Sequence, residues 1–384
     1  MNELRNRIEQ GIKEHGPIPF SRYMELCLYD PEYGYYSRNA EQFGKAGDFY
    51  TSSDVHAVFG RLLARQFDEM WRVLGSPDRV LIRELGPGRG LFAQDVMDWS
   101  EKKFPAFFSA LTYELVDQSP ALRDRIGQTL ASRVQTGKAT LTASDEVLRR
   151  HSVPGVPTIV FANEFFDAIP VEVLSTSGSL HIDSREGRFI ETWLPASAEE
   201  LEYLDRYSVH PEPHEGVEAC LHSQSLMSSI CDIESGFIVV IDYGYTRDEQ
   251  LAGRHRGTLK AIRQHSVSAN PYEAPGEQDI TADVNFTALE AAAKQRGFET
   301  HKLITQSQFL MGIGEANQFA DAFEDCRLPQ ERAKVALQLK HLVTPAGMGE
   351  SFHVLLASKG IDAAKLLTLA GLSFGKKGNE ASLR

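Results

Sequence analysis

The chain has 384 residues, 42% of them hydrophobic and 24% charged, which is the composition of a globular protein whose core closes without disulfides or structural metal. Its 53 acidic and 40 basic residues give a net charge of -13, which argues against general binding to nucleic acid or anionic lipid. The sequence contains no bilayer-length apolar stretch, no secretory signal at its start and no C-x-x-C pair or H-E-x-x-H motif. We therefore expect a cytoplasmic protein without nucleic-acid or membrane partners and without a bound metal.

The first part of the chain predicts a helix. Leu4, Ile8 and Ile12 are four residues apart and form one apolar stripe. We predict an N-terminal helical and lid segment over 1–58, followed by a catalytic core over 59–384.

Strand-like and helix-like segments alternate in the core. Apolar runs of strand length occur at 80–82, 111–116, 139–143, 158–162, 237–241 and 352–357. Helix-length segments such as 91–103 and 119–132 lie between the first of them, which indicates βαβ units. The sequence therefore predicts a doubly wound α/β fold with a mostly parallel sheet. Four of the runs end near acidic or amide residues, at the strand ends where such sheets bind ligands.

Two insertions interrupt this alternation, at about 171–235 and 244–345. The first contains a predicted hairpin with Gly178 and Gly187 at its turns, followed by helical sequence. The second begins polar and rich in loops and becomes helical from about Phe286.

A glycine loop follows the first core strand. The sequence ELGPGRG places Glu84 before Gly86, Pro87, Gly88 and Gly90. This G-x-G-x-G spacing matches neither a dinucleotide-binding loop nor a P-loop. It resembles motif I of class I methyltransferases, in which the acidic residue supports the methionine end of S-adenosylmethionine and the loop lies beneath the ribose.

Two further acidic residues are candidates for the same ligand. Asp117 follows the second strand, where a carboxylate accepts ribose hydroxyls in nucleotide-binding α/β folds. It is equally placed to cap the next helix, a role that is also open to Ser119 before Pro120. Asp145, after the third strand, is a candidate for the adenine end or for an exposed helix start.

Several segments together resemble the MidA-like methyltransferases. They include GPIPFSRYMELCLYDPEYGYY (16–36), GDFYTSSDVHAVFG (47–60), ELGPGRG (84–90), NEFFDAIPV (163–171), IDYGY (241–245) and DITADVNF (279–286). The resemblance implies a class I fold, S-adenosylmethionine as cofactor and, from the mitochondrial branch of the family, an arginine side chain as methyl acceptor. The chain departs from the family pattern at Ser53, Asp54, Leu91 and Asp117.

The segment after the fourth strand carries the predicted chemistry. Asn163, Glu164 and Asp167 follow that strand, and Asn163 is also a candidate cofactor contact. Carboxylates hold a guanidinium well, so we predict that Glu164 and Asp167 orient the acceptor and take its proton. The alternative is that they cap the next turn, with Phe165 and Phe166 in the core.

Other candidates lie outside the alternating core. The segment GDFYTSS predicts a lid, with Asp48, Phe49 and Ser52 toward the substrate and Thr51 toward the cofactor; Thr51 or Ser52 would also suit a helix cap. Asp242 and Tyr243 end the fifth strand and are expected to face the cleft. His265 is a candidate general base, and Asp279 and Asp283 lie in the insertion expected to cover the site.

Three functions fit these patterns. The first is a methyltransferase for a protein arginine, which acts by in-line displacement and for which a homodimer is expected. The second keeps the cofactor but uses a small molecule as acceptor. The third is an assembly factor that binds the cofactor with little catalysis.

Overall fold

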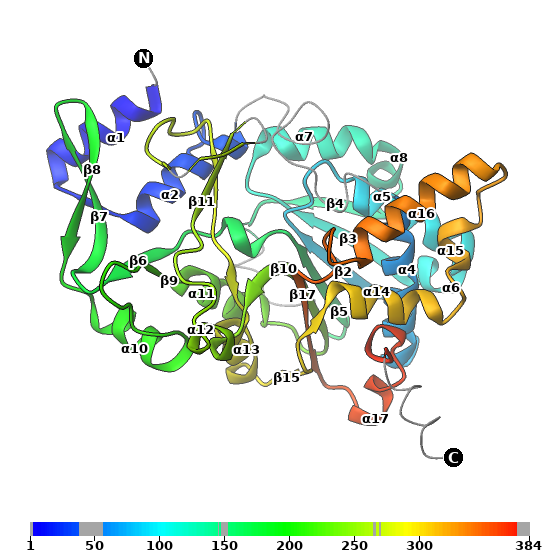
Figure 1. The fold of residues 1–384 in the computed structure, drawn as a ribbon. Coiled ribbons are helices and arrows are strands. Elements are labelled where there is room, and N and C mark those ends of the chain that lie inside the picture. Colours follow the sequence, from blue (N-terminus) through cyan, green and yellow to red (C-terminus); the bar gives the residue numbers. More distant parts are fainter. Residues whose placement is uncertain are drawn as a thin grey trace.

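The structure is a computed structural model, and it describes residues 3–37, 57–144, 146, 153–263, 266–268 and 270–374. A large α/β unit contains a sheet with helices on both faces, and a smaller unit of antiparallel strands and N-terminal helices lies beside it (Figure 1).

The central sheet is mostly parallel. Along its path it runs β4 (Ala139–Thr142), β3 (Leu111–Val116), β2 (Val80–Leu85), β5 (Thr158–Asn163), β10 (Gly236–Tyr245), β17 (Phe352–Lys359) and β15 (Glu299–Thr300). The strands from β4 to β10 pair in parallel, whereas β17 is antiparallel to β10. Two further short strands pair outside this path: β14 (Val284–Asn285) pairs with β10, and β16 (Ile304–Thr305) pairs with β17. All six predicted core strands are confirmed.

The chain order reverses at β2. From this strand the chain proceeds to β3 and β4 on one side and then crosses to β5 and β10 on the other. The carboxyl ends of β2 and β5 therefore flank the switch point at which α/β sheets bind ligands.

Helices cover both faces of the sheet. On one face, α4, α5, α14 and α16 pack on side chains such as Ile82, Tyr113 and Ile159. On the other face, α11 and α13 pack on Val160 and Ile238. The helices of this unit are α4 (Ala57–Val73), α5 (Leu91–Lys103), α6 (Pro105–Ala110), α7 (Pro120–Thr129), α8 (Ala131–Gln135), α11 (Leu221–Ile230), α12 (Arg247–Leu251), α13 (Phe286–Gln295), α14 (Gln306–Glu315), α15 (Ala320–Phe323), α16 (Pro329–Val343), α17 (Ala363–Leu366), η2 (Phe166–Ala168) and η3 (Ala370–Leu372).

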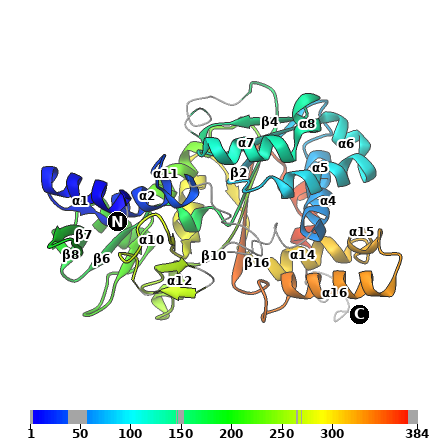
Figure 2. The ribbon, with the colours of Figure 1, turned by 90° about the horizontal axis from the view of Figure 1, so that it is seen from above.

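The smaller unit joins segments that are far apart in the sequence. Its sheet consists of β1 (Ile18–Pro19), β6 (Glu172–Ser175), β7 (Gly178–Arg185), β8 (Arg188–Leu194) and β9 (Val217–Ala219). On it pack α1 (Glu3–His15) and α2 (Phe20–Tyr29), followed by η1 (Tyr35–Ser37), and α10 (Ala198–Tyr207) follows the hairpin (Figure 2). The predicted hairpin is confirmed, with Gly178 and Gly187 at φ 120° and 72°.

The N-terminal helices and the first insertion share one hydrophobic cluster. The predicted stripe of Leu4, Ile8 and Ile12 is buried in it, together with Leu180 and Ile182 of β7. Residues 3–37 are thus packed against the first insertion, an association that the sequence could not show.

The second insertion forms a bridge between the two units. A small antiparallel sheet of β11 (Lys260–Arg263), β12 (Ser266–Ser268) and β13 (Asp279–Thr281) precedes α13, which starts at Phe286 as predicted. Within the described ranges, no helix is both long and apolar enough to cross a membrane.

Candidate active site

A cavity of about 620 Å³ lies at the carboxyl ends of β2, β3, β5 and β10. Its volume falls within the range of small-molecule sites, about 300–1,000 Å³. Its wall includes residues from the sheet, from α11 and from the N-terminal segment, so both units contribute to it.

The glycine loop forms part of the cavity wall. Gly86, Pro87 and Gly88 line it, and both glycines have left-handed φ values, 63° and 52°. A Cβ on Gly86 would lie 2.7 Å from Cδ2 of Phe165, so this position requires glycine. Gly90, also predicted to contact the cofactor, does not line the cavity. At φ 76° it starts α5, and it packs against Ile126 of α7.

Glu84 ends β2 and lies on the cavity wall. Its Oε2 accepts a hydrogen bond of 2.8 Å from the hydroxyl of Tyr113. Burial raises the pKa of Glu84 to about 8, and the Tyr113 hydroxyl opposes that shift. A buried carboxyl group with a raised pKa is suited to bind a cationic group of a ligand, because a nearby positive charge stabilises the ionised form of the carboxyl group.

Asp117 lies at the cavity and does not cap α7. It lines the cavity, and its Oδ1 accepts a hydrogen bond of 2.8 Å from the backbone N–H of Ser119. Ser119 caps α7, since its hydroxyl oxygen accepts from the N–H of Leu122. Burial raises the pKa of Asp117 to about 6. The cap belongs to Ser119, and the carboxylate of Asp117 stays at the cavity.

Asn163 and Glu164 also line the cavity, where β5 ends. Glu164 has a φ of 50°, which is uncommon for a residue with a side chain. Its N–H donates to the carbonyl oxygen of Ile241, and the Asn163 amide donates to Glu164 Oε1 at 3.2 Å. The strained backbone therefore holds this side chain at the ligand edge of the sheet. Of the two phenylalanines, Phe165 lines the cavity and Phe166 is buried in the core.

Asp167 and Tyr243 form a pair on the cavity wall. The Tyr243 hydroxyl donates to Asp167 Oδ2 at 2.6 Å. Burial raises the pKa of Asp167 to about 6, an effect that this hydrogen bond partly offsets. The site therefore holds a carboxylate that titrates near neutral pH in a defined orientation.

The prediction that Asp242 faces the cleft is wrong. Its side chain is fully buried behind the cavity wall. Oδ2 accepts from the N–H groups of Phe165 and Phe166, at 3.1 and 2.9 Å, and from that of Asp167 at 3.4 Å. Burial and the carboxylates of Asp167 and Glu164 raise the pKa of Asp242 well above its ordinary value. The side chain turns inward because β10 passes beside the η2 turn at this point, and the N–H groups there need an acceptor.

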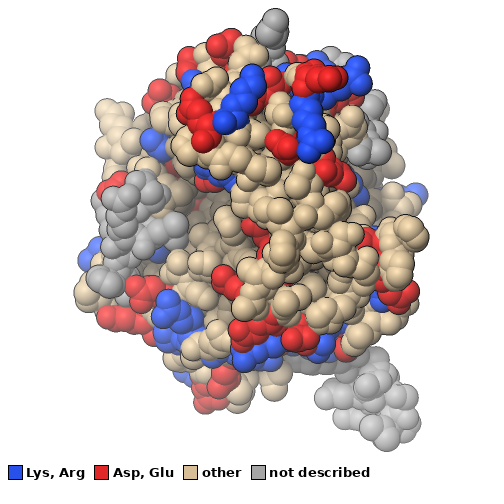
Figure 3. All heavy atoms as spheres, turned by 90° about the vertical axis from the view of Figure 1, so that its left-hand side faces the viewer, with Lys and Arg blue, Asp and Glu red and all other residues tan. Residues whose placement is uncertain are grey.

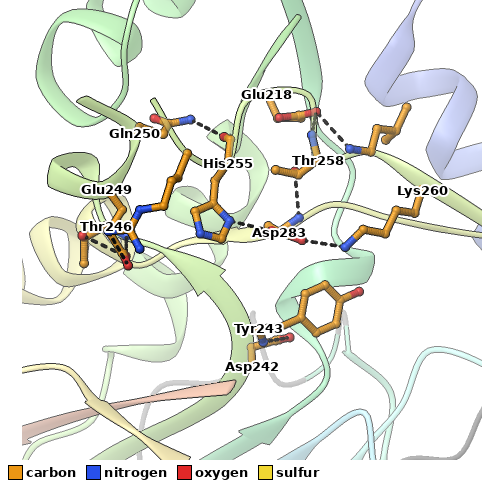
Figure 4. Close-up of polar contacts among 12 residues, drawn as sticks. Glu218, Asp242, Tyr243, Thr246, Glu249, Gln250, His255, Thr258, Lys260 and Asp283 are labelled. Atoms are coloured by element: carbon orange, nitrogen blue, oxygen red, sulfur yellow. Dashed lines mark hydrogen bonds and ion pairs between the residues drawn. The ribbon is translucent and has the colours of Figure 1, made fainter. Parts of the chain in front are cut away.

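Asp283 also lies off the cavity wall, contrary to the prediction. It contacts His255 Nδ1 at 3.0 Å and Lys260 Nζ at 3.1 Å (Figure 4). Its N–H donates to the Thr258 hydroxyl, and the N–H of Thr258 donates to Glu218. These contacts connect the second insertion to β9.

The sequence interpretation missed tyrosines in the N-terminal segment. Tyr29, Tyr35 and Tyr36 line the cavity, and the Tyr36 hydroxyl donates to both carboxylate oxygens of Asp279, at 3.0 and 3.1 Å. Asp279 was predicted to lie near the site and does line it. The available signal was the family-like segment at 16–36, which contains all three tyrosines.

Six predicted site residues lie outside the described part of the chain. They are Asp48, Phe49, Thr51, Ser52, Asp145 and His265. Among the residues that the structure does describe, no three His, Cys, Asp or Glu side chains come together in a group that could hold a metal ion.

Comparison with known proteins assigns the family. Residues 62–304 match a family model described as "Putative S-adenosyl-L-methionine-dependent methyltransferase". The chain belongs to this methyltransferase family. The match confirms the resemblance to the MidA-like methyltransferases.

Relatives of this methyltransferase extend over nearly all of its length. A Drosophila melanogaster homolog of the mitochondrial protein arginine methyltransferase NDUFAF7 is 30% identical, with 94% of this chain and 86% of that protein covered. The Homo sapiens protein arginine methyltransferase NDUFAF7 is 27% identical over 89% of this chain and 80% of its own length. A methyl transferase from Burkholderia thailandensis, solved with bound S-adenosyl-homocysteine, has a TM-score of 0.81 at 27% identity and covers 96% of this chain and 94% of its own.

The cofactor of this methyltransferase is S-adenosylmethionine, and the cavity has the chemistry to hold it. The ligand carries an ammonium, a ribose with two hydroxyls and an adenine. Glu84 would supply a carboxyl group for the cation, Asp117 an acceptor for hydroxyls, and Gly86 and Gly88 a surface without side chains. These residues come from the carboxyl ends of β2 and β3, and the lining also contains Glu164, Asp167, Tyr243 and Asp279.

Proposed function

We propose that this methyltransferase transfers a methyl group to the guanidinium of an arginine in a protein. Relatives of 24–30% identity are named protein arginine methyltransferases, which supports a protein substrate. A cytoplasmic location, a lid formed by GDFYTSS (47–53) and a homodimer remain predictions.

The observation that carries the proposal is the charge of the cavity. Its described lining contains six carboxyl groups and one guanidinium, that of Arg89; the acids are Glu25, Glu84, Asp117, Glu164, Asp167 and Asp279. Glu84 and Asp117 suit the cofactor, so the others remain for the acceptor. An acidic, partly dry site favours a cationic acceptor over a neutral one.

The residues of the chain would orient the acceptor and take its proton. When bound, the cofactor supplies a methyl group that is activated by its sulfonium. Glu164 and Asp167 would hold the N–H groups of the guanidinium so that one nitrogen faces this methyl group. The nitrogen that gains the methyl group loses a proton. Asp167, whose pKa is about 6, is ionised at neutral pH and would accept it.

The decisive experiment separates binding from transfer. Calorimetric titration with S-adenosyl-homocysteine measures the cofactor site, and a cell extract with radiolabelled S-adenosylmethionine tests for acceptors. Label on arginine in a protein band supports the proposal. Label only in small molecules favours a small-molecule acceptor, and tight binding without transfer to anything favours an assembly factor.

The substitution Glu164→Gln tests the mechanism. The amide keeps the shape but loses the negative charge, so we expect transfer to fall about a hundredfold or more while affinity for S-adenosyl-homocysteine changes little. Glu186→Gln is the matched control, because Glu186 also has a φ of 50° but is exposed in the turn between β7 and β8. Unchanged turnover in Glu164→Gln would remove this residue from the mechanism.

A further inference from the structure

A second tyrosine–carboxylate pair lies on the cavity wall, and it comes from segments outside the core sheet. Tyr36 belongs to η1 in the N-terminal segment, and Asp279 begins β13 in the second insertion. Their contact joins residues 243 positions apart in the sequence. Asp279 is only 4% exposed, so its carboxylate is held in a largely dry environment.

The two tyrosine–carboxylate pairs are mechanically connected. The N–H of Ala282, just after β13, donates to the backbone oxygen of Asp167 at 2.9 Å. The Tyr29 hydroxyl donates to the carbonyl oxygen of the next residue, Ala168, at 3.0 Å. The η2 turn that carries Asp167 is therefore held by both the second insertion and the N-terminal segment. This fixes Asp167 and Asp279 relative to each other.

Aromatic rings complete this part of the wall. The rings of Tyr29 and Tyr36 are stacked, with centroids 5.5 Å apart and an interplanar angle of 27°. Tyr35 meets Tyr36 edge to face. Aromatic surface beside carboxylates suits a planar, weakly hydrated cation, because a guanidinium stacks on rings while its edges donate to oxygens.

We propose that Asp279 binds the guanidinium of the acceptor together with Asp167, and that Tyr36 is the residue that positions Asp279. This inference rests on the proposed function. Asp279 lines the cavity, and a carboxylate offers about four acceptor positions. Each tyrosine fixes the direction of its carboxylate, and two carboxylates fixed on different elements select the fork of N–H donors that arginine presents. Lysine, with a single ammonium, uses such a pair less well.

The test uses three small probes and the full chain saturated with S-adenosyl-homocysteine. The probes are the N-acetyl methylamides of arginine, lysine and citrulline, of which citrulline has nearly the shape of arginine without its charge. We expect the wild type to bind the arginine probe at least about tenfold more tightly than either of the others. Equal affinity for arginine and citrulline would overturn the inference.

Two variants test which residues cause the preference for arginine over citrulline. In Asp279→Asn, we expect the preference for arginine over citrulline to fall about tenfold while affinity for S-adenosyl-homocysteine, measured first as the test of folding, stays within about twofold. Tyr36→Phe keeps the ring but removes the hydroxyl, and we expect a smaller loss of the same preference. The matched control is Tyr33→Phe, whose ring packs under Arg7 and does not line the cavity.

The outcomes separate this inference from the proposed function. If the wild type labels arginine in a protein but Asp279→Asn retains full probe preference, the inference fails and the proposed function stands. If the probe preference depends on Asp279 but no acceptor is ever labelled, the guanidinium site stands and the proposed function fails.

Discussion

At the scale of single residues, three left-handed backbone positions lie on the cavity wall. Gly86 and Gly88 have positive φ values, and Glu164 has one despite its side chain. Such positions persist only where the surrounding structure holds them, and they are frequent at functional sites. Here the turn after β2 and the turn after β5 contact each other through Gly86 and Phe165, so the cofactor loop and the acceptor loop share one packing contact.

The substitution Gly86→Ala should break this contact. The new Cβ would lie 2.7 Å from Phe165 at a φ of 63°, so either the loop or the ring must move. We expect affinity for S-adenosyl-homocysteine to fall at least about tenfold and the free energy of unfolding to fall by about 1–3 kcal/mol, measured by calorimetry and urea denaturation. Gly137→Ala is the control, with a φ of 72° but open space around it. It should lose stability without losing affinity, and an equal loss of affinity there would contradict the argument.

The pKa of Glu84 predicts how cofactor binding depends on pH. In the free protein, burial raises this pKa to about 8, and a ligand ammonium beside the carboxylate would lower it. Binding at pH 7 should therefore release a proton, and the affinity for S-adenosyl-homocysteine should rise with pH until it levels off near pH 8. Calorimetry in buffers with different ionisation enthalpies measures the proton release. In Glu84→Gln, the release and the pH dependence should both be lost; their persistence would assign them to another group.

At the scale of elements, the sequence predicted the features that depend on short local patterns, namely the core strands, the glycine loop and the hairpin turns. The period and order of the apolar runs predicted the central strands, and the glycine spacing located the loop after β2. Gly178 and Gly187 located both turns of the hairpin. In each case the signal lies within a few residues, so no knowledge of the rest of the chain was needed.

The wrong predictions concern side-chain direction and long-range packing. Asp242 lies within β10 near the ligand edge, but successive side chains of a strand point to opposite sides, and this one turns toward the N–H groups at η2. Asp283 faces His255 and Lys260 instead of the cavity. Tyr36 and Asp279 meet across 243 residues, and no local pattern encodes such a contact.

The docking of α1 is open to a separate test. Ile8 is 3% exposed and packs in the cluster shared by the N-terminal helices and the first insertion. We expect Ile8→Ala to reduce the free energy of unfolding by about 2–4 kcal/mol and to lower methyl transfer. Affinity for S-adenosyl-homocysteine should be retained, because Glu84 and Asp117 lie on the core sheet. Lys13→Ala, at an exposed position of the same helix, is the control. If Ile8→Ala lost cofactor affinity as well as methyl transfer, the cofactor site would not be independent of the docking of α1.

At the scale of the whole molecule, the net charge of -13 is unevenly distributed. Figure 3 shows one side of the protein, where acidic and basic side chains are interspersed around a broad uncharged area that is hollowed near its middle. The lining of the cavity, by contrast, holds six carboxyl groups and one guanidinium. In the described lining of the cavity, acidic groups therefore outnumber basic ones.

This distribution predicts a dependence on salt. For an acceptor peptide with lysines beside its arginine, kcat/KM should fall several-fold between about 20 and about 200 mM salt, because ions screen the attraction. The affinity for zwitterionic S-adenosyl-homocysteine should change little over the same range. A peptide with glutamines in place of the lysines is the control, and equal salt dependence of the two peptides would contradict a role for the flanking charges.

The N-terminal helices have their binding partners far downstream in the chain. The Tyr23 hydroxyl donates to the carbonyl oxygen of Pro271, 248 residues later, and Arg5 reaches Tyr272 across 267. During synthesis at roughly 5–20 residues per second, these helices leave the ribosome on the order of tens of seconds before that part of the chain exists. Until then, the apolar stripe of these helices is either exposed to solvent or covered by a chaperone. The tyrosines of the cavity wall can take up their final positions only when translation is well past the midpoint of the chain.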